Sequence, residues 1–257
     1  MDETAELNRL SGRAFAAMMG EAPGFEMRQS RDCTLGLSGE PVADLNMMFI
    51  GSDPDAERFL AEGLARCVER ELPLLVVMTP HLAAELSPVA ERLGLTPAGS
   101  VPLMVLRGSA PVRLGRMCNV KRALDTATVR AAGDLVAAAF ELPRDSVARA
   151  LGASLKETSA AETYVGLDAN VAMSAVTVTR TGSTAGIWCM ATPPEHQGKG
   201  MGRALLTRVI EHFRHQGVDR FYLAATTAGR PLYESIGFVT IADYTVWLRG
   251  DSTQMHA

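Results

Sequence analysis

A glycine-rich segment and a tyrosine in the last third of the chain are the residues best suited to chemistry. The segment Gln197–Gly202 follows an apolar run and opens a helical pattern. Its glycines leave backbone N–H groups bare, and a helix N-terminus adds unpaired amides and the positive end of the helix dipole. Tyr233 follows one strand later, where its hydroxyl can give up a proton. Together they indicate an enzyme that holds a pyrophosphate-bearing cofactor and assists a leaving group.

Each of these features has a structural alternative. The segment is also consistent with a glycine-rich turn carrying a solvated lysine, because so short a pattern recurs by chance. Tyr233 is also consistent with a core residue beside Leu232 and Ile236, although a tyrosine ring can pack while its hydroxyl reaches a site. Cys189 lies mid-strand with no histidine at an obvious spacing, so we expect it in the core rather than as a nucleophile.

Composition narrows the class of protein and its partners. The chain has 257 residues, 47% hydrophobic and 21% charged, as expected of a globular protein of one or two domains. The net charge of −4 argues against nucleic acid as the main partner and fits a cationic or neutral small substrate. The four cysteines show no CxxC spacing, which fits a reduced cytosol and gives no support for a metal site.

The same composition gives no sign of export or membrane insertion. The stretch Met1–Glu6 is acidic and has no apolar region of the kind found in secretory signals. The apolar run Leu72–Met78 is too short to span a bilayer. We therefore expect a cytoplasmic protein with no membrane partner.

Strands and helices alternate through the C-terminal part of the chain. The patterns predict a helix carrying Leu205 and Phe213 on its apolar face, which stops at Gly217, and a short helix at Pro231–Ile236. Strands are expected at Val165–Asp168, Val171–Thr179, Gly186–Thr192, Phe221–Ala225 and Phe238–Leu248.

The N-terminal part repeats this order. Strands are expected at Ala43–Ile50, Leu74–Met78 and Leu103–Leu106, a helix whose apolar face runs from Phe59 to Val68, and a short helix at Pro88–Leu93. Both parts end alike, in Leu106-Arg107-Gly108 and Leu248-Arg249-Gly250. We interpret this as an internal duplication with its boundary in 108–115, the alternative being chance likeness of common α/β patterns. The predicted fold class is α/β (α+β), with halves 1–112 and 113–257.

The first half lacks the residues that suit the second half to chemistry. Asp53, Asp55 and Glu57 stand at the position of the glycine loop and would repel a phosphate, and Ala90 stands at the position of Tyr233. We expect this half to pack against the second half and to form one wall of its cleft.

Residues 118–250 resemble the GCN5-related N-acetyltransferase (GNAT) superfamily. The family pattern Gln/Arg-x-x-Gly-x-Gly/Ala is matched by Gln197, Gly200 and Gly202, its strand ending in a Pro-Glu turn by 192–195, and its Leu-Tyr-x-x-x-Gly-Phe segment by 232–238. The first half resembles a degenerate copy, as in tandem GNAT proteins. The resemblance implies, for each half, a mixed and mostly antiparallel sheet flanked by helices.

The resemblance also implies an activity and roles for particular residues. It implies transfer of an acyl group from acetyl-CoA, or another acyl-CoA, to an amine of a small molecule or a peptide N-terminus. Tyr233 would protonate the departing thiolate, and Thr226 stands where the family often has an asparagine. The residues implied in cofactor binding are Met190, Ala191 and Thr192 for the pantetheine arm, and Gln197, Gly198, Lys199, Gly200, Met201, Gly202 and Arg203 for the pyrophosphate.

The general base is the weakest part of this assignment, because Ile187–Ala191 contains no carboxylate. Four candidates stand elsewhere: Glu141, Glu162, Glu195 and His196. We favour Glu141, since the substrate-side loop of the family starts there.

Two other functions are weighed against acyl transfer. A non-catalytic acyl-CoA sensor would also explain the missing base. Such a sensor would bind acetyl-CoA but would not convert it to free CoA. A nicotinamide dinucleotide enzyme would need glycine or alanine at Arg203 and an acid at the end of the next strand, where Ala224-Ala225-Thr226 offers none. The acceptor and the oligomeric state are left open by the sequence.

Overall fold

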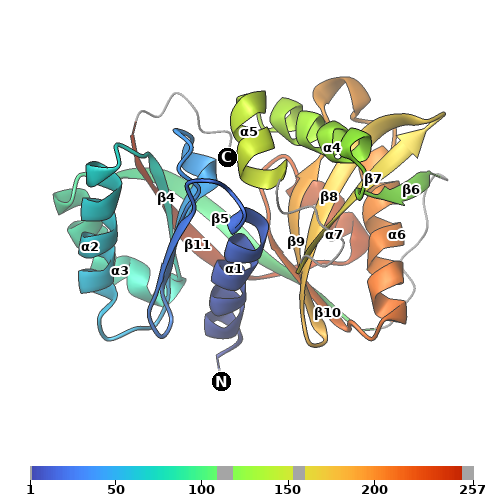
Figure 1. Cartoon of the computed structure of the whole chain (residues 1–257). Coiled ribbons are helices and arrows are strands. Elements are labelled where there is room, and N and C mark those ends of the chain that lie inside the picture. The colour runs from blue at the N-terminus through green and yellow to red at the C-terminus, as the bar shows by residue number, and fades with distance from the viewer. Residues whose placement is uncertain (1, 109–117, 153–159, 251–257) are drawn as a thin grey trace.

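One continuous sheet of eleven strands runs through the computed structural model, which describes residues 2–108, 118–152 and 160–250 (Figure 1). The strands lie in the order β1-β2-β3-β4-β11-β5-β10-β9-β8-β7-β6. Their bounds are β1 Glu26–Gln29, β2 Thr34–Leu37, β3 Asn46–Ile50, β4 Leu74–Met78, β5 Thr96–Arg107, β6 Asn119–Arg122, β7 Ala161–Asp168, β8 Val171–Thr181, β9 Thr184–Ala191, β10 Arg220–Ala224 and β11 Val239–Arg249. The sheet is mixed and mostly antiparallel and has helices on both faces, which confirms the predicted fold class.

The helices divide between the two faces of the sheet. Their bounds are α1 Glu3–Met19, α2 Ala56–Glu69, α3 Pro80–Arg92, α4 Thr126–Ala139, α5 Arg144–Leu151, α6 Met201–His215 and α7 Arg230–Ile236. Successive side chains of a strand point to opposite faces. Thus Phe221 packs in the core with α6 and α7, whereas Tyr222 packs in the core with α1. A further core lies under α2 and α3.

The last strands of the two halves are exchanged. β11, at the end of the second half, pairs antiparallel with β4 and β5 of the first half. β5, at the end of the first half, pairs antiparallel with β10 of the second. Each half therefore completes the sheet of the other. The expected boundary between residues 112 and 113 lies outside the described residues.

The two halves share an order of elements and a turn geometry. The order β3-α2-β4-α3-β5 corresponds to β9-α6-β10-α7-β11, and both β3–β4 and β9–β10 are parallel pairs. After α3, Gly94 has φ of 82° and the N–H of Leu95 donates to the carbonyl of Ala90 at 3.0 Å. After α7, Gly237 has φ of 108° and the N–H of Phe238 donates to the carbonyl of Tyr233 at 3.0 Å. These parallels support the duplication, while the degeneracy of the first half stays a prediction.

The structure corrects several of the predicted elements. The short helix expected at Pro88–Leu93 is the end of a helix that begins at Pro80, because proline is well suited to the first turn. Ala43–Leu45, expected to begin a strand, is a 3₁₀ turn that precedes β3. Val68, expected on the apolar face of α2, is 58% exposed. The other predicted strands and helices are present, although β5 and β7 start earlier than expected, at Thr96 and Ala161.

Helix α1 joins the two halves on the face opposite to α6. Its Glu3 accepts a hydrogen bond from Arg220 of β10 at 3.3 Å, and Glu6 also pairs with that arginine. The Tyr244 hydroxyl on β11 donates to the carbonyl of Thr4 at 3.2 Å. The helix begins at a side-chain cap, because the Asp2 carboxylate accepts from the Thr4 N–H at 3.1 Å. The N-terminal end of α1 is thereby tied to β10 and β11.

Candidate functional site

The site begins where two parallel strands separate. The paired residues of β9 and β10 end at Gly186 and Tyr222, although β9 runs on to Ala191 and β10 to Ala224. On its other edge β9 carries a bulge, since its register with β8 shifts between Trp188 and Ala191. Cys189, inside the bulge, has φ of 47°. The bulge takes residues 189 and 190 out of the ladder, so their backbone groups are available to a ligand.

A cavity of about 680 Å³ fills the space between these strands and extends under the first half. This volume is within the range of small-molecule sites. Its lining residues come from β9, the loop after it, the start of α6 and the β10–α7 region, and also from α1, the 3₁₀ turn 43–45 and α4. Both halves therefore contribute to it, as the sequence predicts for the cleft wall.

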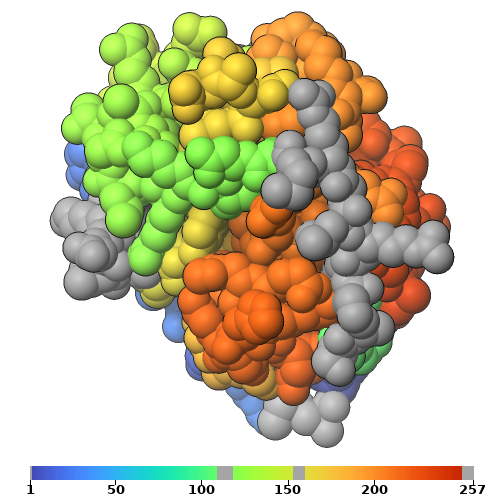
Figure 2. All heavy atoms as spheres, turned by 90° about the vertical axis from the view of Figure 1, so that its right-hand side faces the viewer, coloured from blue at the N-terminus to red at the C-terminus, as the bar shows by residue number. Residues whose placement is uncertain are grey.

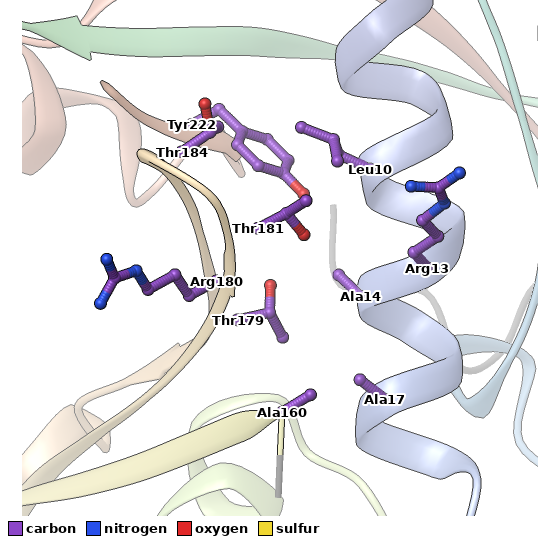
Figure 3. A pocket seen from close by; sticks show the side chains of 10 residues that line it. All are labelled: Leu10, Arg13, Ala14, Ala17, Ala160, Thr179, Arg180, Thr181, Thr184 and Tyr222. Carbon is purple, nitrogen blue, oxygen red and sulfur yellow. The ribbon is translucent and has the colours of Figure 1, made fainter. Parts of the chain in front are cut away.

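A second cavity, of about 120 Å³, lies between α1 and the β8–β9 turn (Figure 3). Arg13 and Arg180 are among its lining residues, and Tyr222 lies at one end of it. Its volume is that of only a few water molecules. None of the predicted site residues lines it, so the larger cavity is the candidate active site.

The glycine loop has the geometry that an anion site needs. Gly198 and Gly200 have φ of 71° and 76°, a left-handed conformation that favours glycine. A Cβ at Gly202 would lie 2.8 Å from the Thr192 hydroxyl oxygen, so the helix start packs tightly against the end of β9. The amides of residues 201–203 open α6 and have no acceptor within the helix. The loop is thus a concave donor surface that fits a pyrophosphate.

Polar side chains brace this loop. Gln197 Nε2 donates to the carbonyl of Thr192 at 2.9 Å, and Lys199 Nζ donates to that of Glu195 at 2.7 Å. Arg203 donates to the carbonyl of Ser235 at 3.1 Å, which ties α6 to the end of α7. Of the predicted binding residues, Ala191 is buried and Lys199 is exposed, and neither lines the cavity. The other predicted binding residues all line the cavity: Met190, Thr192, Gln197, Gly198, Gly200, Met201, Gly202, Arg203 and Thr226.

Tyr233 combines a packed ring with a place on the cavity wall. It is 8% exposed, and its ring meets Phe238 edge-on with centroids 5.9 Å apart. Burial, with a smaller contribution from Cys189, raises the pKa of Tyr233 to about 12. Its hydroxyl therefore keeps its proton at neutral pH, as a general acid must. Thr226 accepts a hydrogen bond from the N–H of Gly229 at 3.1 Å and so shapes the turn before α7.

Cys189 also lines the cavity. Burial, assisted by the nearby charge of Asp44, raises the pKa of its thiol to about 12. A thiol in this state is a poor nucleophile, because the thiolate is the reactive form.

The four base candidates have different environments. His196 lines the cavity, and its buried Nδ1 has no hydrogen-bond partner among the described residues. Glu141 is exposed after α4 with φ of 51°, between the lining residues Phe140 and Leu142. Glu162 accepts from the Tyr164 hydroxyl at 2.7 Å and pairs with Arg122 at 3.3 Å. Glu195 is exposed and does not line the cavity.

The sequence analysis expected the first half to form one wall of the cleft but did not identify the residues that do so. Asp44, in the 3₁₀ turn, lines it, as do Phe15, Met18 and Met19 at the end of α1. No local motif surrounds Asp44 in the sequence. The amphipathic pattern of α1 was the one signal that a further helix was available to cover the site.

In the first half, the carboxylate of Asp53 accepts hydrogen bonds from the donors that stand at the position of the glycine loop. Asp53 accepts from the Ser30 hydroxyl at 2.7 Å and from the N–H groups of Asp32 and Asp55 at 3.2 and 2.9 Å. Burial alone would raise the pKa of Asp53, but these hydrogen bonds outweigh it and lower the pKa. These donors of the loop are therefore already hydrogen-bonded within the protein.

Comparison with known proteins agrees with this geometry. Residues 135–238 match the model of the Acetyltransferase (GNAT) family. The part of the chain in which the motifs lie is thus similar to this family.

Solved structures similar to this chain share its fold over nearly the whole length. A GCN5-related N-acetyltransferase from Kribbella flavida superposes with a TM-score of 0.72 at 13% identity, over 98% of this chain and 97% of the other. A tandem GNAT protein from the clavulanic acid biosynthesis pathway gives 0.59 at 15% identity, over 98% and 96%. At these identities the likeness establishes the fold alone.

Two curated relatives match a short segment of the sequence. They are mycothiol acetyltransferases from Thermobispora bispora and Beutenbergia cavernae, each 40% identical, over 55 and 63 residues. These segments are 20% and 23% of this chain and only 19% and 21% of the relatives. The chain thus matches about a fifth of their length.

The outer surface of the second half is formed in part by β6, α4 and α6. Figure 2 views this half, where residues of β6 and α4 (green) lie beside those of α6 (orange). In 2–108, 118–152 and 160–250, no three His, Cys, Asp or Glu side chains are grouped to hold a metal ion. No helix in those ranges combines the length and apolar character that a membrane span requires.

Proposed function

We propose that the protein transfers an acetyl group from acetyl-CoA to an amine by direct attack. One observation carries the proposal: the glycine loop that suits a pyrophosphate and the hydroxyl-bearing Tyr233 line the same cavity, at the point where β9 and β10 separate. The match of residues 135–238 to the GNAT family supports it.

The chain's own residues would hold the donor in an extended conformation. The amides of residues 198–203 take the pyrophosphate, with Arg203 adding positive charge at the start of α6. The backbone of Met190 and Thr192 takes the pantetheine arm along the open edge of β9. Bound acetyl-CoA supplies the acyl group as a thioester.

Transfer then needs one bond to form and one to break. The amine nitrogen bonds to the acyl carbon, the carbon–sulfur bond breaks, and Tyr233 gives its proton to the departing sulfur. The nitrogen releases one proton to water, and Tyr233 regains one, so the tyrosine ends unchanged. The raised pKa of Tyr233, about 12, keeps it protonated before each turnover.

The test is release of free CoA from acetyl-CoA with a panel of amines, together with calorimetric titration of CoA. We expect turnover with at least one amine and one CoA bound per chain, in the second half. Binding without turnover on any amine would favour the sensor function instead. Two equivalent CoA sites, or none, would contradict the assignment of the loop.

A further inference from the structure

We propose that the acceptor is an aromatic amine, whose nitrogen is uncharged at neutral pH, and that its ring binds in the part of the cavity walled by α1, α4 and β9. This inference rests on the proposed acyl transfer and names the class of amine that the same cavity takes.

The bulge of β9 divides the cavity into two sides. Met190 packs against the core cluster that contains Tyr233, under α6 and α7. Cys189, the residue before it, packs against the clusters that contain Phe15 of α1 and Val136 of α4. All five residues line the cavity. Under the proposed function the donor occupies the side of Tyr233 and the glycine loop. The side of Phe15 and Val136, which we call the second side, is then left for the acceptor.

The second side offers aromatic rings and flexible apolar side chains. The rings belong to Phe15, Phe140 and Trp188, and the flexible side chains to Met18, Met19 and Met47. Trp188 is held in place because its Nε1 donates to the Thr179 hydroxyl at 3.0 Å. Phe15 meets Phe49 edge-on, with ring centroids 6.2 Å apart. Aromatic rings pack well against other rings, and methionine adapts its shape to them. This side therefore fits an aromatic body.

The second side is a poor environment for a cation. Asp44 is the one charged residue among the described residues that line it. Asp44 already takes part in another interaction of the chain, and its Oδ2 atom is shielded from solvent. We therefore count it as part of the wall and not as a partner of the ligand. An ammonium group here would lose its hydration among apolar side chains, which costs free energy. An uncharged nitrogen carries no such cost.

Three of the four candidate bases also stand away from the cavity. Glu141, Glu162 and Glu195 do not line it, and His196 adjoins the glycine loop in the chain. An alkylamine has a pKa of about 10, like lysine, so on the order of one molecule in a thousand is neutral at pH 7. A base must remove its proton before it can attack.

An aromatic amine needs no such base. Its lone pair is shared with the ring, so the nitrogen is unprotonated at neutral pH and can attack the thioester directly. The nitrogen bonds to the acyl carbon, the carbon–sulfur bond breaks, and Tyr233 protonates the sulfur. The nitrogen then releases one proton to water, and Tyr233 regains one. The described wall of the cavity thus suits an acceptor that arrives uncharged.

The first experiment compares two isomers, 4-ethylaniline and phenethylamine. They contain the same atoms, but at pH 7 only phenethylamine is a cation. Each is titrated calorimetrically into the wild-type protein saturated with CoA, which cannot acetylate it. We expect 4-ethylaniline to bind at least about tenfold more tightly at pH 7. Equal or tighter binding of phenethylamine would overturn the proposal.

A pH series separates charge from shape. The affinity for phenethylamine should rise by about tenfold per pH unit from pH 7 to 9, as its neutral form increases, while that for 4-ethylaniline stays constant. The described titratable side chains that line the cavity are Asp44, Cys189, His196, Arg203 and Tyr233. Both ligands meet the same side chains, so a change in the charge of the protein would act on both. A difference in affinity that does not shrink as the pH rises would overturn the proposal.

A pair of variants locates the ring. Ala139 and Ala138 are neighbouring half-buried residues of α4, and only Ala139 lines the cavity. Ala139→Phe should weaken 4-ethylaniline binding at least tenfold and leave CoA affinity unchanged, with Ala138→Phe like wild type. Equal binding of 4-ethylaniline to Ala139→Phe and wild type would place the ring elsewhere and overturn the proposal. The two ligand comparisons use wild type alone and decide the matter even if Ala139→Phe fails to fold.

The remaining outcomes distinguish this inference from the proposed function. If 4-ethylaniline binds with this selectivity but no amine is ever acetylated, the acyl transfer fails and the amine site stands. If alkylamines are acetylated with a higher kcat/KM than aromatic amines at pH 7, the transfer stands and the inference fails. If octanoyl-CoA binds at least tenfold more tightly than acetyl-CoA and 4-ethylaniline does not bind, the second side belongs to the acyl chain of the donor, which also overturns the proposal.

Discussion

Trp247 of β11 pairs with Val76 of β4, so the last strand of the chain completes the sheet of the first half. The indole is also buried in the core under α2 and α3. In return, Met104 and Leu106 of β5 are buried in the core under α6 and α7. Each half therefore depends on the other for a strand and for part of its core.

The first prediction follows from this exchange. Fragments 1–112 and 113–257, expressed separately, should each fail to fold, because the first loses Trp247 and the edge of β4 is left unpaired, while the second loses β5. Co-expressed, they should form a stable complex that elutes as one species and has the circular dichroism of the intact chain. Fragment 113–257 folding alone and binding CoA would contradict the prediction.

The second prediction concerns the glycine loop. Gly200→Glu should weaken CoA binding by at least about 2 kcal/mol, because it places a negative side chain at the donor surface that holds the pyrophosphate. Calorimetry measures the loss.

Gly182→Glu is the matched control for this variant. Gly182 has φ of 61° in the β8–β9 turn, and a Cβ there meets no atom within 4 Å, as at Gly200 with φ of 76°. Both variants carry the same charge and similar backbone strain, so they should lose similar stability, but only Gly200→Glu should lose CoA affinity. Equal CoA affinity in the two variants would show that the loop does not hold the cofactor.

The loop and Tyr233 could be recognised from the sequence because their residues are contiguous or lie within one strand and one helix of each other. A short motif fixes a local backbone shape, and the left-handed φ at Gly198 and Gly200 is a shape that glycine favours. The elements from β7 to β11 followed from periodicity for the same reason, whereas β6, α4 and α5 were not predicted.

Asp44 and the end of α1 could not be recognised, since their place in the cavity depends on tertiary packing. Asp44 lies far along the chain from Cys189, and nothing near it in the sequence indicates that its charge acts on this thiol. The strand exchange could not be predicted from the sequence either, because β5 and β11 have similar apolar patterns. The pattern alone does not decide which neighbouring strand each of them pairs with. The long α3 was missed because Pro88 was interpreted as a start, and Pro80 supplies that start instead.

The third prediction concerns stability at alkaline pH. Burial raises the pKa of all four tyrosines, that of Tyr233 to about 12, from an ordinary value near 10. Below pH 10 the tyrosines keep their protons in both the folded and the unfolded chain, so their contribution to the free energy of unfolding is fully present. Above pH 10 the unfolded chain loses them first, and stability falls until the folded pKa is passed.

Tyr233 alone should account for a loss of about 2–3 kcal/mol between pH 10 and 12. The thiols of Cys33, Cys67 and Cys189, whose pKa burial raises to about 11, 11 and 12, should start the decline from about pH 9. Urea unfolding at intervals from pH 7 to 11.5 measures the curve, and Tyr233→Phe should flatten its upper part. A free energy of unfolding that stays constant to pH 11 would refute the burial of these groups.

The fourth prediction tests the role of Tyr233. Tyr233→Phe keeps the ring against Phe238 and removes only the hydroxyl. If the hydroxyl protonates the leaving sulfur, kcat should fall by about 10²-fold or more, while CoA affinity barely changes. The stability cost should be at most about 1 kcal/mol, that of one lost hydrogen bond.

Tyr164→Phe provides the control for this substitution. Tyr164 is also a buried tyrosine, it donates to Glu162 at 2.7 Å, and it does not line the cavity. It should lose stability but keep the wild-type kcat, so a change in rate confined to Tyr233→Phe cannot come from loosened packing. Because the pKa of Tyr233 is about 12, the wild-type rate should also show no loss of the acid between pH 7 and 10. An unchanged kcat in Tyr233→Phe would remove Tyr233 from the reaction and leave a mechanism without this acid, or the sensor function, in its place.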